Sequence, residues 1–291
     1  MIRAPVFYFY TYKEKTMEYK RILTVQDISC VGQCSLTVAL PILSACGIET
    51  SILPSAVLST HTAGFSGFTF RDLTDDMPSI KEHCQKEGIK FDGIYTGYLG
   101  SIKQVAYVKD ILDTMGRENA VTVVDPAFAD NGKLYPIFDD FYVNAMKTLC
   151  PSADILLPNI TEACFLSGVE YREVYDEGYI KALLEALSKL GCHTIVLTGV
   201  GYIPEKTGVV VYENGNISYY EHRRISKGCH GTGDVYASAF TGALIRGKSI
   251  FEAAKIAADY TVLCIENTKD DPAHWYGVKF EPILPKLIEM I

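Results

Sequence analysis

Residues 227–234 are Lys-Gly-Cys-His-Gly-Thr-Gly-Asp, and the apolar stretch 235–245, Val-Tyr-Ala-Ser-Ala-Phe-Thr-Gly-Ala-Leu-Ile, follows them directly. Apolar side chains recur at helical spacing in this second part, which predicts an amphipathic helix. Its apolar stripe consists of Val235, Ala239, Phe240, Ala243 and Leu244. Glycines directly before a helix let backbone amides converge, and the helix dipole favours negative charge there. The stretch therefore predicts an anion-binding turn at a helix N-terminus.

A second phosphate-binding pattern overlaps the same helix. Residues 242–249, Gly-Ala-Leu-Ile-Arg-Gly-Lys-Ser, match the P-loop pattern GxxxxGK[ST] letter for letter. A P-loop must follow a strand and begin a helix, whereas this match starts inside the predicted helix. We therefore interpret the match as coincidental, with Gly247 ending the helix and Ser249 capping the next one.

Upstream, the chain alternates between short β-branched runs and longer amphipathic segments, which is typical of βαβ units and a parallel sheet. The predicted strands lie near residues 21–26, 50–56, 93–96, 121–124, 154–157 and 194–197. Residues 207–213 and 216–222 flank an Asn-Gly turn, which predicts an antiparallel hairpin at one sheet edge. We expect one α/β domain, residues 20–291, after an N-terminal extension, residues 1–19, that is expected to be flexible.

Polar residues stand where these strands are predicted to end. They are Gln26-Asp27, Thr96-Gly97-Tyr98, Asp125-Pro126, Pro158-Asn159 with Glu162, and Thr198-Gly199. Asp, Asn and Thr are ordinary helix caps and turn residues, so each one alone has a structural explanation. Ligands of open α/β sheets bind beyond the carboxyl ends of the strands, however, and a succession of such ends favours one shared crevice.

Composition narrows the class of protein further. The chain has 27 Lys+Arg against 35 Asp+Glu, a net charge of −8, which argues against a nucleic-acid partner. Its nine cysteines are odd in number and form no CxxC pair, which favours a reducing cytoplasm over a disulfide framework or structural zinc. No apolar run reaches the roughly 20 residues of a membrane span. The aromatic and basic start lacks a signal-peptide cleavage site, and either Met1 or Met17 is a suitable translation start.

Asp234, in the first turn of the predicted helix, has two interpretations. A carboxylate there complements the helix dipole, which is a purely structural role. Beside an anion-binding turn it can instead accept a proton from a hydroxyl that attacks a phosphoryl group. The spacing leaves both interpretations open.

Gly231-Thr232-Gly233-Asp234 resembles the signature of the ribokinase-like superfamily, and within it the chain is most similar to the pyridoxal/pyridoxamine/pyridoxine kinase group. Other segments that carry the resemblance are 22–32, 57–62, 96–98, 124–126 with Asp130, and 153–168. The resemblance implies a three-layer α-β-α sandwich with a mostly parallel central sheet, usually assembled as a homodimer. It also implies phosphorylation of the 5′-hydroxymethyl group of vitamin B6 with ATP and Mg²⁺, often with K⁺ or Na⁺.

The same resemblance implies roles on the acceptor side. Asp234 resembles the catalytic base, and the amides of Gly231, Thr232 and Gly233 resemble the anion hole. Positions that surround the pyridine ring match Asp27, Cys34, Thr62 and Tyr98. A related subgroup has a cysteine near Cys229 that engages the substrate aldehyde, but ordinary packing is the simpler interpretation here.

Roles on the nucleotide side are also implied. Asn159 and Glu162 resemble the pair that orders Mg²⁺ and its waters, with Glu162 and Asp125 as the expected metal ligands. Asp125 and Asp130 resemble acidic positions near the triphosphate and the cation. Thr198 and Gly199 begin the nucleotide-binding loop.

Asp27 departs from the pattern, because pyridoxal kinases typically carry serine there. An ionised carboxylate accepts hydrogen bonds and does not donate them, so it favours a protonated pyridine, a cationic aminomethyl group or an aminopyrimidine. We therefore expect pyridoxamine as the preferred substrate, with hydroxymethylpyrimidine, the substrate of a sister family, as an alternative.

Two further function classes stay open. One is a nucleotide-dependent dehydratase of hydrated NAD(P)H, which carries a similar glycine motif in the same superfamily. The other is a vitamer-binding regulator without catalytic activity. A sugar kinase ranks lower, because those relatives usually carry a long β-lid insertion early in the chain, for which this sequence leaves no room.

Overall fold

The computed structural model describes residues 18–225 and 229–291. Within them, one sheet has the strand order β11-β10-β9-β8-β5-β4-β1-β2-β3. Its strands are β1 (Arg21–Ser29), β2 (Glu49–Leu58), β3 (Phe70–Asp72), β4 (Phe91–Thr96), β5 (Gly116–Val124), β8 (Ile155–Leu156), β9 (Thr194–Val200), β10 (Lys206–Glu213) and β11 (Asn216–Arg223). The helices are α1 (Leu36–Ala45), α2 (Met77–Lys86), α3 (Ile102–Thr114), α4 (Asp140–Lys147), α5 (Ile160–Ser167), α6 (Glu177–Ser188), α7 (Thr232–Ile245), α8 (Ile250–Thr268) and α9 (Leu284–Met290), with short 3-10 turns η1 (Cys150–Ser152) and η2 (Glu281–Ile283).

The central strands β2, β1, β4, β5, β8 and β9 pair in parallel, which confirms the predicted βαβ organisation. The predicted hairpin is confirmed as well, since β10 and β11 pair antiparallel at one edge of the sheet. Its turn residues Asn214 and Gly215 both have positive φ, as the tight Asn-Gly turn requires.

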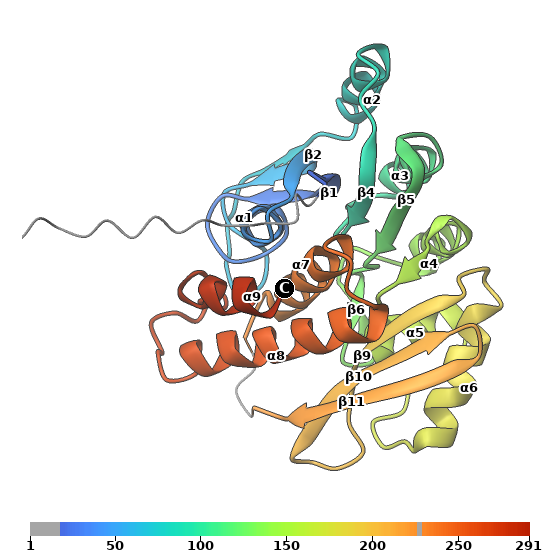
Figure 1. Cartoon of the computed structure of the whole chain (residues 1–291), viewed down its shortest axis with the longest axis vertical. Coiled ribbons are helices and arrows are strands. Elements are labelled where there is room, and N and C mark those ends of the chain that lie inside the picture. Colours follow the sequence, from blue (N-terminus) through green and yellow to red (C-terminus); the bar gives the residue numbers. More distant parts are fainter. Residues whose placement is uncertain (1–17, 226–228) are drawn as a thin grey trace, which may run out of the picture.

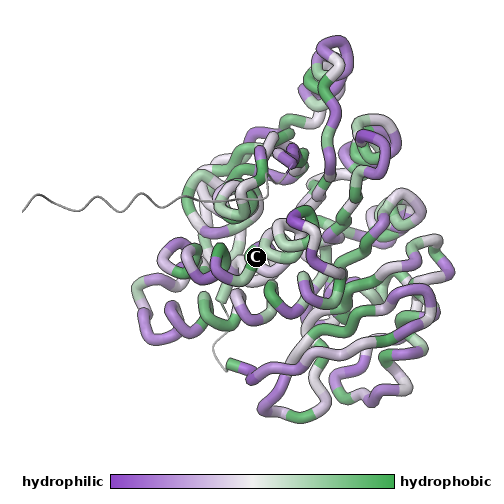
Figure 2. Tube along the Cα trace, in the orientation of Figure 1, coloured by the Kyte–Doolittle hydropathy of each residue, from purple (hydrophilic) through white to green (hydrophobic). Residues whose placement is uncertain are grey.

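Helices cover both faces of the sheet, as Figure 1 shows, so the expected three-layer sandwich is confirmed. Neighbouring residues of a strand point to opposite faces. Ile22 of β1 therefore packs in the core formed with α1, α7, α8 and α9. Its neighbour Leu23 packs in the core formed with α2 to α6. The central strands are correspondingly apolar along much of their length in Figure 2, whereas the edge strand β11 is more polar.

Helix α7 differs from the prediction in one respect. Every residue from Val235 to Ala243 is buried, so the helix is covered on all sides and is not amphipathic. The reason is its position, since α1 and α8 pack against it in addition to the sheet. Gly247 follows the helix with φ +90° and Ser249 caps α8 with a capping box, as expected.

Three short strands were not predicted. β3 adds to the sheet edge beside β2, and β6 (Ala129–Asp130) pairs with β7 (Lys133–Leu134) in a separate small hairpin. Two- and three-residue strands have no detectable alternation of apolar and polar residues, so sequence periodicity cannot reveal them.

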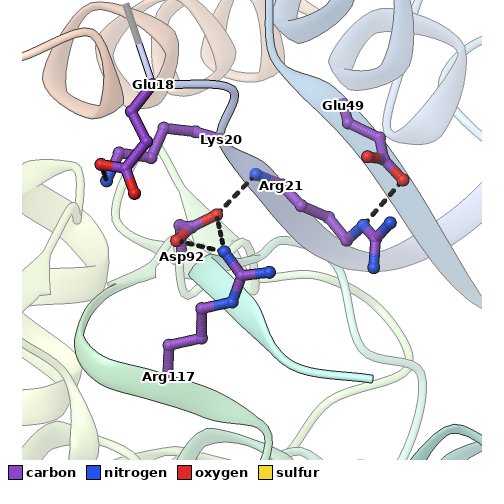
Figure 3. Close-up of polar contacts among 6 residues, drawn as sticks. All are labelled: Glu18, Lys20, Arg21, Glu49, Asp92 and Arg117. Carbon is purple, nitrogen blue, oxygen red and sulfur yellow. Dashed lines mark hydrogen bonds and ion pairs between the residues drawn. The ribbon is translucent and has the colours of Figure 1, made fainter. Parts of the chain in front are cut away.

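At the amino-terminal ends of the central strands, Asp92 of β4 links its own strand to β1 and β5 (Figure 3). Its carboxylate accepts the backbone N–H of Arg21 at 2.7 Å and the Arg117 guanidinium at 2.9 and 3.0 Å. Arg21 in turn contacts Glu49 of β2, with Nε 2.7 Å from Oε1. Burial raises the pKa of Asp92, but the Arg21 amide and the Arg117 guanidinium outweigh it and hold this pKa below its ordinary value. The charged form of Asp92 therefore stabilises the fold.

We expect Asp92→Asn to lower the free energy of unfolding by about 1.5–3 kcal/mol, the usual value for hydrogen bonds to a charged group. Because the folded-state pKa is lowered, this contribution is present at neutral pH and is lost as the pH falls through the acidic range. Urea unfolding at pH 7 and pH 4 measures both effects. Asp75→Asn is the matched control, because Asp75 pairs with Lys103 at the exposed surface and should change stability by less than about 1 kcal/mol.

Candidate active site

The glycine turn at the start of α7 is held by the loop that follows β1. Gly231 has φ +77°, and a Cβ atom there would lie 1.8 Å from the Gln33 carbonyl oxygen. Both the backbone conformation and the close approach therefore require glycine at this position. The contact fixes the turn against a segment almost two hundred positions earlier in the chain.

Gly233 has a different environment. It is exposed, and no atom lies within 4 Å of the place that its Cβ would occupy. Thr232 donates its hydroxyl to the Cys229 carbonyl at 3.4 Å. Open space above the first turn of a 14-residue helix suits a ligand anion, because the free N–H groups of that turn point toward it. Lys227 and Gly228, which belong to the motif in the sequence, lie outside the described residues.

Asp234 stands in the first turn of α7, as predicted, and it is partly buried. Burial is the main cause that raises its pKa to about 7, and the negative charge of Asp27 adds to this effect. The nearby backbone amide of Ser35 acts in the opposite direction. A carboxyl group with a pKa near 7 can take up a proton and release it again at neutral pH.

Asp27 lies within β1 and not after it, which corrects the prediction, because β1 continues to Ser29. The register between β1 and β2 shifts around Asp27, and Ile28 bridges back to Ser35. This fold-back places two hydroxyls on the buried carboxylate, with Ser35 Oγ 2.5 Å from Oδ1 and Ser29 Oγ 3.1 Å from Oδ2. Burial raises the pKa of Asp27, and the two hydroxyls partly offset it.

Two other residues that were predicted to surround the acceptor substrate lie close to Asp27. Burial is the main cause that raises the pKa of Tyr98 to about 12, and the negative charge of Asp27 adds to this effect. Burial together with Asp234 and Asp27 raises the pKa of the Cys34 thiol, so this cysteine is a neutral group and not a reactive thiolate. Thr62 is exposed, whereas its neighbour His61 is buried.

The predicted nucleotide-side residues form a connected group. Asn159 and Glu162 make a capping box at the start of α5, and Glu162 also accepts the Phe128 amide at 3.1 Å. Burial raises the pKa of Glu162 to about 7. Burial, together with the charges of Glu162 and Asp234, raises the pKa of Asp125 well above its ordinary value. Asp125 thus interacts electrostatically with both Glu162 and Asp234.

The remaining positions on this side are more exposed. Asp130 holds Asn131, accepting its backbone N–H at 2.8 Å and its side-chain amide at 2.9 Å. Thr198 and Gly199 lie inside β9 and not after it, a second correction of a strand end. Thr198 still bridges to Asn159, because its amide donates to the Pro158 carbonyl at 2.9 Å. Gly199 has φ +76° and open space around its Cβ position.

No group of three or more His, Cys, Asp or Glu side chains that could hold a metal ion occurs in residues 18–225 and 229–291. Asp125 and Glu162 are only a pair of buried carboxylates. Mg²⁺ commonly binds through one or two carboxylates, waters and substrate phosphates, so a pair fits Mg²⁺ better than a complete protein cage would. In the same part of the chain, no helix is long and apolar enough to cross a membrane.

A glycine turn beside a carboxylate, at the carboxyl ends of the strands of this three-layer sandwich, is the arrangement expected of the ribokinase-like superfamily. The sequence pattern of the phosphomethylpyrimidine kinase family matches residues 58–277. The chain belongs to this family.

Similar structures and sequences are described either as pyrimidine kinases or as pyridoxal kinases. A candidate phosphomethylpyrimidine kinase from Bacteroides thetaiotaomicron is 35% identical, with a TM-score of 0.89 over 95% of this chain and 96% of its own, and a second crystal form of it contains pyridoxal. A pyridoxal kinase from Lactobacillus plantarum is 30% identical, with a TM-score of 0.87 over 94% and 98% of the two chains. A hydroxymethylpyrimidine/phosphomethylpyrimidine kinase from Bacillus subtilis is 26% identical over 74% of this chain and 77% of its own.

Proposed function

We propose that the protein transfers the terminal phosphoryl group of ATP to the 5′-hydroxymethyl group of a vitamin B6 vitamer, with pyridoxamine as the preferred acceptor. The observation that carries this proposal is the buried carboxylate of Asp27, next to Tyr98 and on the same side of the site as Asp234. Pyridoxal kinases and a pyridoxal-containing structure among the relatives support it.

In the proposed mechanism, Asp234 accepts the proton of the acceptor hydroxyl as the oxygen attacks phosphorus. A pKa of about 7 suits a base that is partly ionised at neutral pH and is easily protonated during the reaction. The backbone amides of Gly231, Thr232 and Gly233 face the transferring group and stabilise its charge.

The nucleotide side is proposed to hold the triphosphate and its ion. Glu162 and Asp125 would hold Mg²⁺, which neutralises phosphate charge when bound. Asn159 positions Glu162 through the capping box, and its amide also donates to the Ala129 carbonyl at 2.8 Å. Asp130, Thr198 and Gly199 are proposed to contact the nucleotide. A requirement for K⁺ or Na⁺, a homodimer and a cytoplasmic location stay predictions from the family resemblance.

Asp27 is proposed to select the acceptor by charge. Both of its hydrogen-bond donors are neutral hydroxyls, so the carboxylate can still pair with a cationic group of the acceptor. Pyridoxamine supplies a cationic aminomethyl group, whereas pyridoxal carries an aldehyde in its place.

We therefore expect Asp27→Ser to lower the ratio of kcat/KM for pyridoxamine to kcat/KM for pyridoxal by about tenfold or more, since one charge-assisted hydrogen bond contributes about 1.5–3 kcal/mol. Steady-state kinetics with both vitamers measures this ratio. Asp130→Ser is the control, because Asp130 lies on the nucleotide side and should change both acceptors equally. An unchanged ratio in Asp27→Ser would show that Asp27 does not select the acceptor.

The second candidate function is phosphorylation of hydroxymethylpyrimidine. Asp27 also suits the amino group of an aminopyrimidine, and the family match and the Bacillus subtilis relative favour this substrate. A coupled ADP-release assay with MgATP and pyridoxal, pyridoxamine, pyridoxine or hydroxymethylpyrimidine in parallel distinguishes the two functions. The proposal is wrong if only the pyrimidine is turned over, and the kinase assignment itself fails if none of the four releases ADP above background.

A further inference from the structure

The segment 274–277, His-Trp-Tyr-Gly, follows α8 and is here named the C-terminal strap. It packs against the loop that also fixes the glycine turn. A Cβ atom at Gly277 would lie 2.5 Å from Gln33 Oε1 and 2.7 Å from Gln33 Cβ. Gln33 thus contacts Gly231 through its carbonyl and the strap through its side chain. The strap is therefore attached to the candidate active site, although it is distant from the glycine motif in sequence.

His61 joins the strap to the acceptor side. Its side chain is buried, and Nδ1 accepts the Ala63 N–H at 3.2 Å. Nε2 therefore carries the proton and donates it to the Tyr276 carbonyl, 2.6 Å away. The ring is also packed against Gly32, where a Cβ would lie 2.1 Å from His61 Cδ2. His61 is thus held in one orientation by its two hydrogen bonds and by Gly32.

A row of rings runs from the glycine turn to the strap. His230, which directly precedes Gly231, lies 5.7 Å from His61 between ring centroids. His61 lies 5.0 Å from Phe65, and Phe65 lies 4.7 Å from Trp275. Trp275 ends the row with 46% of its surface exposed, backed by Gly64, where a Cβ would lie 2.8 Å from the indole. The partly exposed indole thus ends a row of ring contacts that starts beside the glycine turn.

We propose that the C-terminal strap is the outer wall of the acceptor site. The Trp275 indole determines acceptor affinity by stacking on a flat heteroaromatic ring of the substrate. His61 is a positioning residue that holds the strap in place. This inference rests on the proposed function, which supplies the acceptor. Aromatic rings favour offset or edge contacts with other rings, and such contacts add to the gain from burying apolar surface.

Trp275 is the single tryptophan of the chain, so intrinsic fluorescence reports on the strap directly. Adding pyridoxamine or hydroxymethylpyrimidine to the wild-type protein should change the tryptophan emission saturably, while ATP with Mg²⁺ alone should change it little. Free N-acetyltryptophanamide, titrated in the same way, corrects for absorption by the added ring. An emission that does not respond to an acceptor that the enzyme phosphorylates overturns the inference and leaves the proposed function intact.

Kinetics of variants provides the second test. Trp275→Ala should raise KM for the acceptor about tenfold, with kcat and KM for ATP changed less than twofold, whereas Trp275→Phe should keep most of the affinity. Equal changes in both KM values would indicate general disruption of the fold and would overturn the assignment of Trp275.

His61 permits a matched pair of substitutions. His61→Gln can keep a donor toward the Tyr276 carbonyl, while His61→Asn can keep only the acceptor for the Ala63 N–H. We expect His61→Asn to raise acceptor KM as Trp275→Ala does, and His61→Gln to restore much of the affinity at a similar melting temperature. If Gln and Asn are equally impaired, the hydrogen bond to the strap does not position the site.

Discussion

Asp234→Asn is expected to lower kcat by about 100-fold or more, because the variant keeps the shape of the side chain but cannot accept the hydroxyl proton. KM for ATP should change little, since the backbone amides of the glycine turn are unaltered. Steady-state ADP release measures kcat and KM for ATP, and calorimetry measures whether the variant still binds the acceptor. Loss of turnover with retained binding would exclude a noncatalytic vitamer-binding regulator as the native function, whereas a loss below tenfold would leave Asp234 as a helix-terminal carboxylate only.

The same residue gives a pH prediction with a definite sign. Burial raises the pKa of Asp234 to about 7, so the base is lost as the pH falls through neutrality and the rate should fall with it. Stability should move in the opposite direction. The folded state binds this proton more tightly than the unfolded chain, so Asp234 lowers the free energy of unfolding as the pH rises from about 4 to about 7. Asp234→Asn should make that slope shallower without abolishing it, because Glu162 contributes in the same pH range, and urea unfolding at several pH values detects the difference.

Gly231→Ala is the second substitution with a large expected effect. Alanine must adopt φ +77° and place its Cβ 1.8 Å from the Gln33 carbonyl oxygen, so the turn and the loop after β1 have to separate. The left-handed conformation alone costs about 1–2 kcal/mol. A displacement on the order of 1 Å of the anion-binding amides should lower kcat/KM by roughly 100-fold. Thermal unfolding and steady-state kinetics measure the two effects.

Gly233→Ala is the matched control for stability. Its Cβ meets no protein atom and no positive φ opposes it, so we expect a melting temperature equal to that of the wild type or slightly higher. Activity should nevertheless fall, because the added methyl group enters the space proposed for the phosphoryl group. A stable and fully active Gly233→Ala variant would place the phosphoryl group elsewhere.

The two strand-end corrections have a common physical cause. Asp27 and Thr198 were expected just after their strands, but pairing with β2 and with β10 extends β1 to Ser29 and β9 to Val200. Hydrogen bonding between strands depends on partners distant in sequence, so local composition predicts that a strand exists better than where it ends.

His61 and Trp275 are residues that the sequence analysis did not single out, for a different reason. In the sequence, His61 is one polar residue of a loop, and Trp275 is a single aromatic residue near the C-terminus. His61 lies in segment 57–62, which carries the family resemblance, but no role was predicted for it, and Trp275 belongs to no motif. Long-range contacts bring these segments to one place, among them the approach of Gln33 to both Gly231 and Gly277 and the His61–Tyr276 hydrogen bond.

The sequence by itself determined the parallel α/β architecture, the edge hairpin and the glycine turn with Asp234, because strand periodicity, turn chemistry and helix-start signals are local properties of a few neighbouring residues. The tertiary structure alone decided which loop holds Gly231, how Asp27 comes to be buried beneath two serine hydroxyls, and which rings form the row from His230 to Trp275. Those features depend on close contacts between segments far apart in the chain, and such contacts form only when the sheet, its register and the covering helices are all in place.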